Sequence, residues 1–278
     1  EVDLFDGAPE IGGQFTMARR IPGKEEFHET LRYFTNRIAD SGVRLHLSRR
    51  VSAADVEGLG VDEVVLATGV TPRDPHIPGQ DGANVVSYID VLAGDAPVGD
   101  RVAIVGAGGI GFDVAEFLAT APGESATLDL QEWLHEWGVT DPAEARGGLT
   151  KPAPTPAVRT VTLLQRKSGK LGKGLGKTTG WIHRATLVAK GVSMLPGVNY
   201  ERITPGGLVV SFGDKHEREH LVEADTIVLC AGQEPLRDLE PALRAAGIPV
   251  HVIGGADEAA ELDAKRAIDQ GTRVAATI

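Results

Sequence analysis

Short apolar segments alternate with amphipathic ones along the chain, and this alternation predicts strands separated by helices. The apolar runs at 101–105 and 224–230 are typical of strands that are buried on both faces. Apolar residues recur at helical spacing along one face of 24–41, at Phe27, Leu31, Phe34 and Ile38. Because strands that alternate with helices favour parallel sheets, we expect an α/β fold.

The same patterns predict the remaining elements, and the length of 278 residues suits two medium-sized domains. Further strands are expected at 2–5, 43–47, 61–67, 160–164, 192–195, 207–212, 219–222 and 250–253. Further helices are expected at 109–120, 180–190, 236–246 and 258–277, with a short amphipathic piece at 128–137. Prolines and glycines mark 71–83 as a loop, and Pro97–Asp100 mark a junction between domains.

Charge and composition exclude several classes of protein. The net charge of −11 disfavours nucleic acid and anionic lipid as partners. The one cysteine, Cys230, cannot by itself supply a disulfide, a CxxC redox pair or an iron–sulfur site, and we expect it to be buried in a strand. No apolar run reaches the roughly 18–20 residues of a membrane span and no signal peptide opens the chain, so we expect a cytoplasmic protein.

Residues 106–111 carry the pattern G-x-G-x-x-G between an apolar strand and a predicted helix. Gly106 permits the tight turn, Gly108 lets the backbone approach a pyrophosphate, and Gly111 lets the helix pack closely on the strand. The start of the helix then offers N–H groups and partial positive charge to phosphates. We therefore expect a dinucleotide to be bound by Gly106, Gly108, Gly109, Ile110 and Gly111.

The end of the next strand selects the dinucleotide, because an acid there favours NAD and a basic cluster accommodates the 2′-phosphate of NADP. Here Gln165, Arg166 and Lys167 follow the strand at 160–164, without an acid. This pattern favours NADPH; the alternative is that Arg166 and Lys167 are a solvated surface pair. The interval from the glycines is about 55 residues rather than about 20, which predicts an insertion between the helix and the second strand.

A second glycine-rich segment, 174–178, looks like a phosphate-binding P-loop but departs from the pattern. Leu171 stands where the pattern requires glycine, and no apolar strand precedes it. The lysines of this region, Lys167, Lys170, Lys173 and Lys177, either close over phosphates or belong to a flexible solvated loop.

The start of the chain carries signs of a second, incomplete dinucleotide site. Asp6 ends a predicted strand, where an acid can hold a ribose; if it does so, the first strand and its glycines precede Glu1. Gly12 and Gly13 either let the backbone approach a phosphate or flavin, or form an ordinary turn. Two other strand ends meet small-residue turns, Thr68-Gly69 and Ala231-Gly232, and Gly254–Asp257 lead into the last helix.

Several of these pieces together resemble the C-terminal part of bacterial NADPH-dependent 2,4-dienoyl-CoA reductase, within the trimethylamine dehydrogenase-like flavoproteins. The resemblance covers nearly the whole chain. It is carried by 11–15, 21–27, the strand ends at 66–72 and 230–235, 106–111, 176–184 and 261–264.

The resemblance implies two Rossmann-like nucleotide-binding domains, with an NADP-binding domain at 98–232 inserted in an FAD-binding domain at 1–97 plus 233–278. The FAD-binding domain would lack its first strand and glycine turn. Hydride would pass from NADPH to FAD, and electrons would pass on to an N-terminal TIM barrel of the same full-length protein, which carries FMN, a 4Fe-4S cluster and the dienoyl-CoA site. The expected FAD-binding residues are Asp6, Gly13, Gln14, Thr68, Gly69, Gly232, Gly255 and Asp257.

Two alternatives to this reductase remain open. The chain could be a nucleotide-binding fragment without activity, or an electron-transfer subunit of the ferredoxin–NADP reductase or glutamate synthase type. A thioredoxin-reductase type of disulfide reductase is disfavoured because Cys230 stands alone. We assign no acid, base, nucleophile or metal ligand to the chain, because the redox chemistry belongs to the cofactors.

Overall fold

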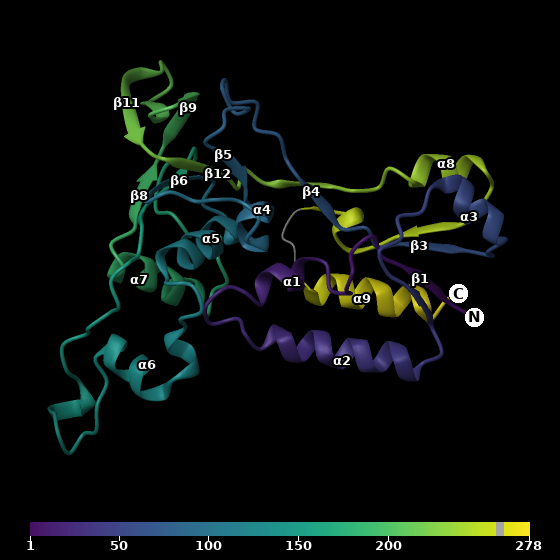
Figure 1. Ribbon diagram of the computed structural model, residues 1–278, viewed down its shortest axis with the longest axis horizontal. Helices are drawn as coiled ribbons and strands as arrows, with labels where there is room; N and C mark the ends of the chain where they lie inside the picture. Colours follow the sequence, from purple (N-terminus) through teal and green to yellow (C-terminus); the bar gives the residue numbers. More distant parts are fainter. Residues whose placement is uncertain (260–263) are drawn as a thin grey trace. The chain divides into compact units, whose positions relative to one another are not determined.

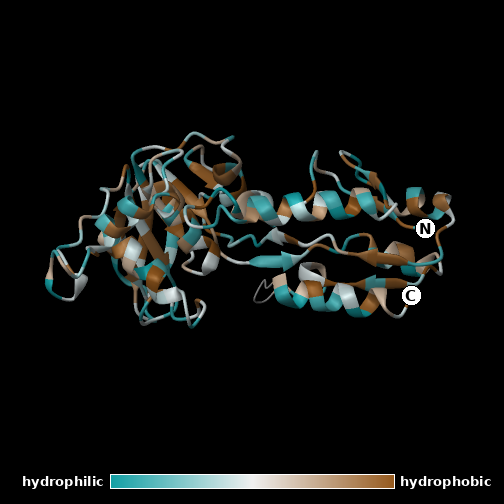
Figure 2. Ribbon diagram, turned by 90° about the horizontal axis from the view of Figure 1, so that it is seen from below, coloured by the Kyte–Doolittle hydropathy of each residue, from teal (hydrophilic) through white to brown (hydrophobic). Residues whose placement is uncertain are grey.

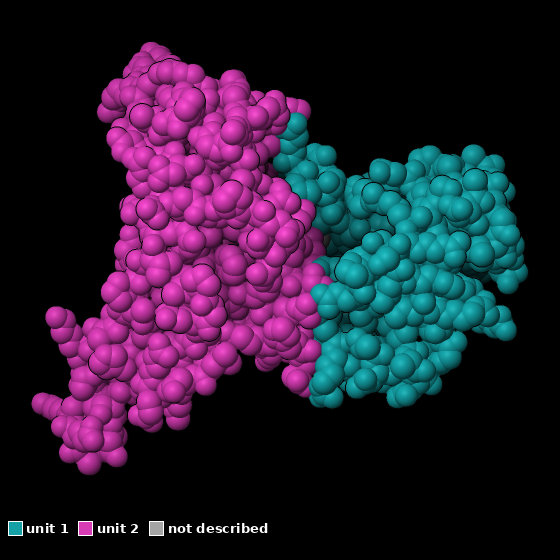
Figure 3. All heavy atoms as spheres, in the orientation of Figure 1, with its two compact units in different colours: residues 1–13, 30–74, 232–278 teal, residues 14–29, 75–231 magenta. Residues whose placement is uncertain are grey.

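The structure is a computed structural model that describes residues 1–259 and 264–278 (Figure 1). The resembling segment Glu261–Asp263 and part of the helix expected at 258–277 lie outside the described residues. The chain divides into two compact units, coloured separately in Figure 3. Unit 1 comprises 1–13, 30–74 and 232–278, and unit 2 comprises 14–29 and 75–231.

Unit 2 is built on a five-stranded sheet in which every neighbouring pair of strands is parallel. The strands follow the order β5 (Val85–Ser87), β12 (Thr226–Leu229), β6 (Arg101–Val105), β7 (Thr160–Gln165) and β8 (Ser193–Pro196). The helices of this unit are α1 (Gln14–Ala18), α4 (Tyr88–Ala93), α5 (Gly109–Ala119), α6 (Leu130–Trp137) and α7 (Gly180–Ala189). This arrangement confirms the expected α/β class.

Both faces of the sheet are buried, which explains why its central strand is wholly apolar after Arg101. Successive side chains of a strand point to opposite faces. Val102 and Ile104 pack with the helices α4, α5 and α7, whereas Ala103 and Val105 pack with the opposite layer. That layer is the antiparallel sheet of β9 (Val198–Thr204), β10 (Gly207–Phe212) and β11 (Glu217–Glu223). Figure 2 shows hydrophobic residues, in brown, concentrated in the interior strands of the larger unit.

The long interval between the glycine turn and β7 is an insertion that follows α5, as expected from the sequence. It contains α6 and two short 3-10 turns, η1 (Ala126–Leu128) and η2 (Arg146–Gly148). Asp129 caps the start of α6 by accepting hydrogen bonds from the backbone of Gln131 and Glu132, at 2.8 and 3.0 Å. Gly138 ends the helix in the left-handed conformation that favours glycine.

Within its described residues, unit 1 contains three separate two-stranded sheets. Two are parallel, β1 (Asp3–Phe5) with β2 (Arg44–His46) and β3 (Val64–Leu66) with β14 (Val250–Val252); β4 (Val70–Pro72) pairs antiparallel with β13 (Gln233–Pro235). The helical elements are α2 (Phe27–Asp40, in this unit from residue 30), α3 (Ala53–Leu59), α8 (Glu240–Ala245), η3 (Gly254–Ala256) and α9 (Ala264–Ala275). Its core is formed by Val56, Leu66, Leu243 and Val250.

The two units differ from the expected domains at 14–29 and 75–97 and nearly coincide with them at the later border. The border at 231/232 lies one residue from the expected border. Residues 75–97 belong to unit 2 because β5 pairs with β12. Residues 14–29 also belong there, and Ile21, which is 1% exposed, lies in the core beside α5. No helix of the described residues is long and apolar enough to cross a membrane.

Candidate nucleotide-binding sites

The turn between β6 and α5 requires glycine at two positions for steric reasons. Gly106 has φ +109°, and a Cβ added there would lie 2.2 Å from the carbonyl oxygen of Cys230. A Cβ at Gly111 would lie 1.9 Å from the carbonyl oxygen of Gly106. The first and last glycines of the motif therefore allow backbone segments to approach each other, as the sequence pattern indicates.

The middle of the turn is open instead. A Cβ at Gly108 or Gly109 would meet nothing within 4 Å, and both residues are exposed. Gly108 caps α5 without a side chain, and the first N–H groups of a helix have no partner within the helix. A bare backbone with free donors and the positive end of the helix dipole fits a pyrophosphate.

Pairing of β6 with β7 brings the two cations expected to select NADPH, Arg166 and Lys167, beside this turn. Val105 is the register partner of Leu164, and the backbone N–H of Gly106 donates a hydrogen bond to the Leu164 carbonyl oxygen at 2.9 Å. Arg166 and Lys167 follow at once and are exposed. Within the described ranges, neither side chain forms an ion pair that would occupy it.

Tyr200 of β9 supports the same strand end and was missed in the sequence. Its hydroxyl donates a hydrogen bond to the Leu164 carbonyl oxygen at 3.2 Å. Burial raises the pKa of Tyr200 to about 12, although the neighbouring positive charge of Arg166 acts in the opposite direction. The phenol therefore stays neutral and donates near neutral pH. A strand was not expected at 198–204, so no signal pointed to this residue.

The lysine-rich loop after β7 is anchored to the helix that follows the glycine turn. Leu171 is 2% exposed and belongs to the same core as Phe112 of α5. A Cβ at Gly172 would lie 2.8 Å from the Phe112 ring, so this contact is close. Lys170, Lys173 and Lys177 remain exposed around it. β7 ends at Gln165, so no strand leads directly into 174–178 as a P-loop would need.

In unit 1, Thr68, Gly69 and Gly255 lie together. The Thr68 hydroxyl donates a hydrogen bond to the Leu236 carbonyl oxygen, and the Leu236 N–H donates to the Gly69 carbonyl oxygen at 3.0 Å. A Cβ at Gly255 would lie 3.2 Å from the carbonyl carbon of Gly69 and 2.8 Å from Cγ1 of Val70. These residues thus form one close-packed corner where β4 begins.

The other expected flavin-site residues are distributed more widely. Asp6 follows β1, and its Oδ1 accepts a hydrogen bond from the Ala8 N–H at 2.9 Å, which fixes a carboxylate suited to a ribose hydroxyl. Gly13 has φ +51° with open space around it, while Gln14 begins α1 in unit 2. Gly232 lies at the opposite end of the β4–β13 pair from Gly69.

Asp257 is already engaged within the protein. Its Oδ2 accepts a hydrogen bond from the Gln270 side chain at 2.8 Å, and the same side chain accepts one from the Gly254 N–H at 2.7 Å. Asp257 therefore fixes the turn before α9 through Gln270.

Cys230 is buried, as expected, and lies directly after β12. Burial raises the pKa of its thiol far above the ordinary range. A protonated, inaccessible thiol is a poor nucleophile, so this residue is not poised for disulfide chemistry.

Known proteins resemble the chain along nearly its whole length. It is 29% identical to a metal reductase of Desulforamulus reducens over 261 residues, covering 92% of this chain and 37% of that protein. It is 25% identical to a bilirubin reductase of Mediterraneibacter gnavus over 272 residues, covering 98% of this chain and 36% of that protein. Its structure is similar to that of 2-naphthoyl-CoA reductase in complex with 2-naphthoyl-CoA, with a TM-score of 0.79 and 22% sequence identity. The similarity covers 100% of this chain and 36% of that protein.

The chain thus spans little more than one third of the length of these relatives. The family model described as pyridine nucleotide-disulphide oxidoreductase matches residues 11–262, a range that includes the glycine turn and most of both units. With its two Rossmann-like units, the chain belongs to the pyridine nucleotide-disulphide oxidoreductase family of flavoproteins, for which binding of FAD and NAD(P)H is typical.

Proposed function

We propose that the chain is the NADPH-oxidising part of a flavin oxidoreductase, in which hydride passes from NADPH to FAD. The observation that carries the proposal is the parallel pairing of β6 with β7. It joins a glycine turn suited to a pyrophosphate to a strand end with two unpaired cations, Arg166 and Lys167. An acid at that strand end would favour NADH instead.

The pyrophosphate and the 2′-phosphate of NADPH each have a matching group in unit 2. The open backbone at Gly108 and Gly109 receives the pyrophosphate. The guanidinium of Arg166 suits the 2′-phosphate because its planar array of donors can bind two phosphate oxygens at once. Lys167 adds a second positive charge beside it.

FAD is assigned to unit 1, where Asp6 would hold a ribose hydroxyl and the corner formed by Thr68, Gly69 and Gly255 would lie against the cofactor. The close approach of Gly255 to Gly69 supports this assignment, because a larger residue would alter the surface of that corner. Bound FAD supplies the hydride-accepting ring, and the protein supplies position and electrostatics.

For a longer protein containing this chain, we propose an FMN and 4Fe-4S barrel that reduces 2,4-dienoyl-CoA. The relatives named above are nearly three times as long as the matched region. The name of 2-naphthoyl-CoA reductase, which is similar over the whole chain, supports a thioester of coenzyme A as the substrate class. The sequence pieces at 21–27 and 176–184 support the dienoyl-CoA assignment.

A second candidate is a nucleotide-binding segment that holds NADPH without flavin chemistry. The division of the described part of unit 1 into three separate two-stranded sheets favours it, because dinucleotides bind at the carboxyl ends of strands within one larger, mostly parallel sheet. The two candidates share the site in unit 2 and differ only in whether unit 1 retains FAD.

An anaerobic spectral titration distinguishes the candidates. The chain is incubated with FAD, freed of unbound flavin and titrated with NADPH while flavin absorbance is followed. Loss of flavin absorbance, weaker in Arg166→Ala at the same NADPH concentration, supports hydride transfer. Retained flavin that NADPH does not bleach contradicts it, and a colourless protein that still binds NADPH supports the second candidate.

A further inference from the structure

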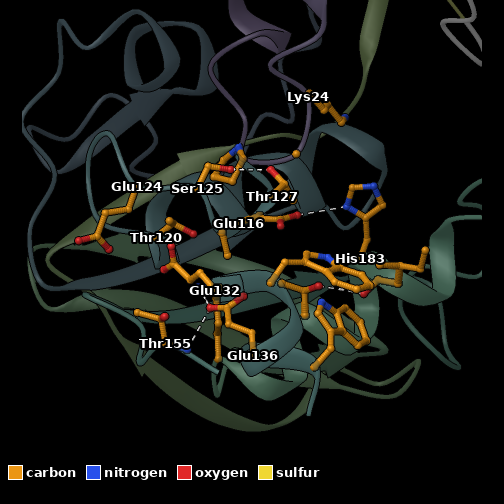
Figure 4. A pocket seen from close by; sticks show the side chains of 18 of the residues that line it. Lys24, Glu116, Thr120, Glu124, Ser125, Thr127, Glu132, Glu136, Thr155 and His183 are labelled. Atoms are coloured by element: carbon orange, nitrogen blue, oxygen red, sulfur yellow. Dashed lines mark hydrogen bonds and ion pairs between the residues drawn. The ribbon is translucent and has the colours of Figure 1, made fainter. Parts of the chain in front are cut away.

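Unit 2 contains a cavity of about 390 Å³ that the proposed nucleotide chemistry does not use (Figure 4). It lies between the C-terminal half of α5, helices α6 and α7, and residues 22–27. Glu116 and Thr120 line it from α5, seven and eleven positions after Gly109. At the helical rise this is about 10–16 Å from the helix start, so the cavity is separate from the glycine turn.

One wall of the cavity is an aromatic and acidic face of α6. Glu132-Trp133 is repeated one turn later as Glu136-Trp137, and residues four apart are neighbours on a helix surface. The two indole rings have centroids 6.1 Å apart, and Trp137 also contacts Trp181 of α7 at 6.5 Å. The insertion therefore places indole rings next to carboxylates on this wall.

The cations around the cavity are already matched by acids. Lys24 pairs with Asp113 at 2.6 Å, and Lys190 lies 4.0 Å from Glu136. His183 contacts Glu116 at 3.2 Å.

Three other acids that line the cavity are not paired with a cation in the described residues. Glu26, Glu124 and Glu132 form no ion pair with any of the residues that the structure describes. The cavity therefore carries an excess of negative charge.

A buried hydroxyl at the end of α5 also lacks a partner. Thr120 caps the C-terminus of the helix and lines the cavity; its Oγ1 is buried without a hydrogen-bond partner in the described structure. Leaving such a group unpaired costs free energy, so a ligand that donates a hydrogen bond to it gains affinity. The negative end of the α5 dipole adds a preference for positive charge.

We propose that this cavity binds a protonated organic amine with a small apolar body. The ammonium group would donate to Thr120 Oγ1 and to the carboxylate of Glu132, and the apolar body would lie against Trp133 and Trp137. Ammonium groups are attracted to indole faces as well as to carboxylates. A carboxylate or phosphate ligand would instead face Glu116, Glu124 and Glu136, and no unpaired cation among the described lining residues would receive it.

Matched probes of a single shape test the proposal. Benzylamine, benzyl alcohol and benzoate share one ring but differ in charge. All three tryptophans of the chain, Trp133, Trp137 and Trp181, belong to the cluster at this cavity, so tryptophan fluorescence reports on it directly. The variants are Glu132→Gln and Thr120→Val, with Glu217→Gln on β11 as a control for an exposed carboxylate remote from the cavity.

We expect benzylamine to bind about tenfold more tightly than benzyl alcohol, and benzoate not to bind. Glu132→Gln should lower the affinity for benzylamine about tenfold, so that it becomes similar to the affinity for benzyl alcohol. Thr120→Val should weaken benzylamine binding by a smaller factor, and Glu217→Gln should leave it unchanged. NADPH should bind equally well to all variants. Equal affinities of amine and alcohol would overturn the proposal, as would benzylamine binding that Glu132→Gln leaves unchanged.

Discussion

The backbone N–H of Gly106 donates a hydrogen bond to the carbonyl oxygen of Leu164 at 2.9 Å. This bond joins the ends of β6 and β7, although the two residues are separated by α5 and a long insertion. Because of it, the glycine turn and the cations at Arg166 and Lys167 lie at the same edge of the sheet. The expected specificity for NADPH follows from that proximity.

Gly111→Ala should destabilise unit 2 strongly. The new Cβ would lie 1.9 Å from the Gly106 carbonyl oxygen, so α5 must move away from β6. Overpacking of this kind costs about 3 kcal/mol of unfolding free energy, measurable by urea denaturation. An unfolding midpoint equal to that of the wild type would contradict the close helix–strand approach.

Gly108→Ala is the matched substitution in the same turn, with the opposite expectation. Its Cβ would meet nothing within 4 Å, and φ of −80° suits alanine, so stability should be unchanged. The methyl group would occupy space assigned to the pyrophosphate, so NADPH should bind about tenfold more weakly by calorimetry. Unchanged NADPH affinity would show that the pyrophosphate does not lie against Gly108.

The ion pair of His183 with Glu116 should make stability depend on pH. The hydrogen bond to Glu116 raises the pKa of His183 above its ordinary value of 6.5. The stabilisation is therefore fully present below that value and is lost as pH rises through the raised pKa of the folded state.

We expect His183→Gln to lose about 1 kcal/mol of unfolding free energy relative to wild type near pH 6, and clearly less near pH 9. Urea denaturation at both pH values measures the difference. A loss that is the same at both pH values would show that His183 acts through packing rather than through its charge.

Cys230 should be inert in the folded protein. Burial and the resulting rise in the pKa of its thiol prevent formation of a reactive thiolate. A thiol-specific colorimetric reagent should leave the native protein unmodified and should titrate one thiol after unfolding in guanidinium. Rapid modification of the native protein, or loss of NADPH binding in Cys230→Ala, would contradict a purely structural role.

Local sequence patterns predicted the elements that are strongly apolar or bounded by glycine. The strand at 101–105 has the expected bounds, and α5 ends one residue before its expected end. The amphipathic piece at 128–137 became α6, with Gly138 as its stop. In each case the residues themselves specify burial or termination, and tertiary contacts change little.

Elements whose identity depends on distant partners were missed. β9 carries charged and polar residues such as Asn199 and Glu201, so its pattern does not indicate a strand; pairing with β10 makes it one. β5 is three residues long and lies between the loop expected at 71–83 and the junction expected at 97–100, where no strand was expected; it is defined by pairing with β12. Tyr200 was missed for the same reason, and the grouping of residues 75–97 with unit 2 likewise depends on strand pairing.

The candidate site shows the same division. The candidate residues of the glycine turn and the two cations at 166–167 could be proposed from the sequence, because their chemistry is local. Only strand pairing could show that Leu164 lies beside Gly106. The cavity at α6 could not be predicted, since Thr120, Glu132 and residues 22–27 come together only through packing of the insertion.

The most direct test of the account compares dissociation constants for NADPH and NADH in wild type, Arg166→Ala and the exposed control Arg146→Ala. Wild type and Arg146→Ala should bind NADPH at least about tenfold more tightly than NADH. Arg166→Ala should lose most of that preference by weakening NADPH alone. Equal weakening of both nucleotides in Arg166→Ala, or a wild type without preference, would contradict the selector assigned to the end of β7.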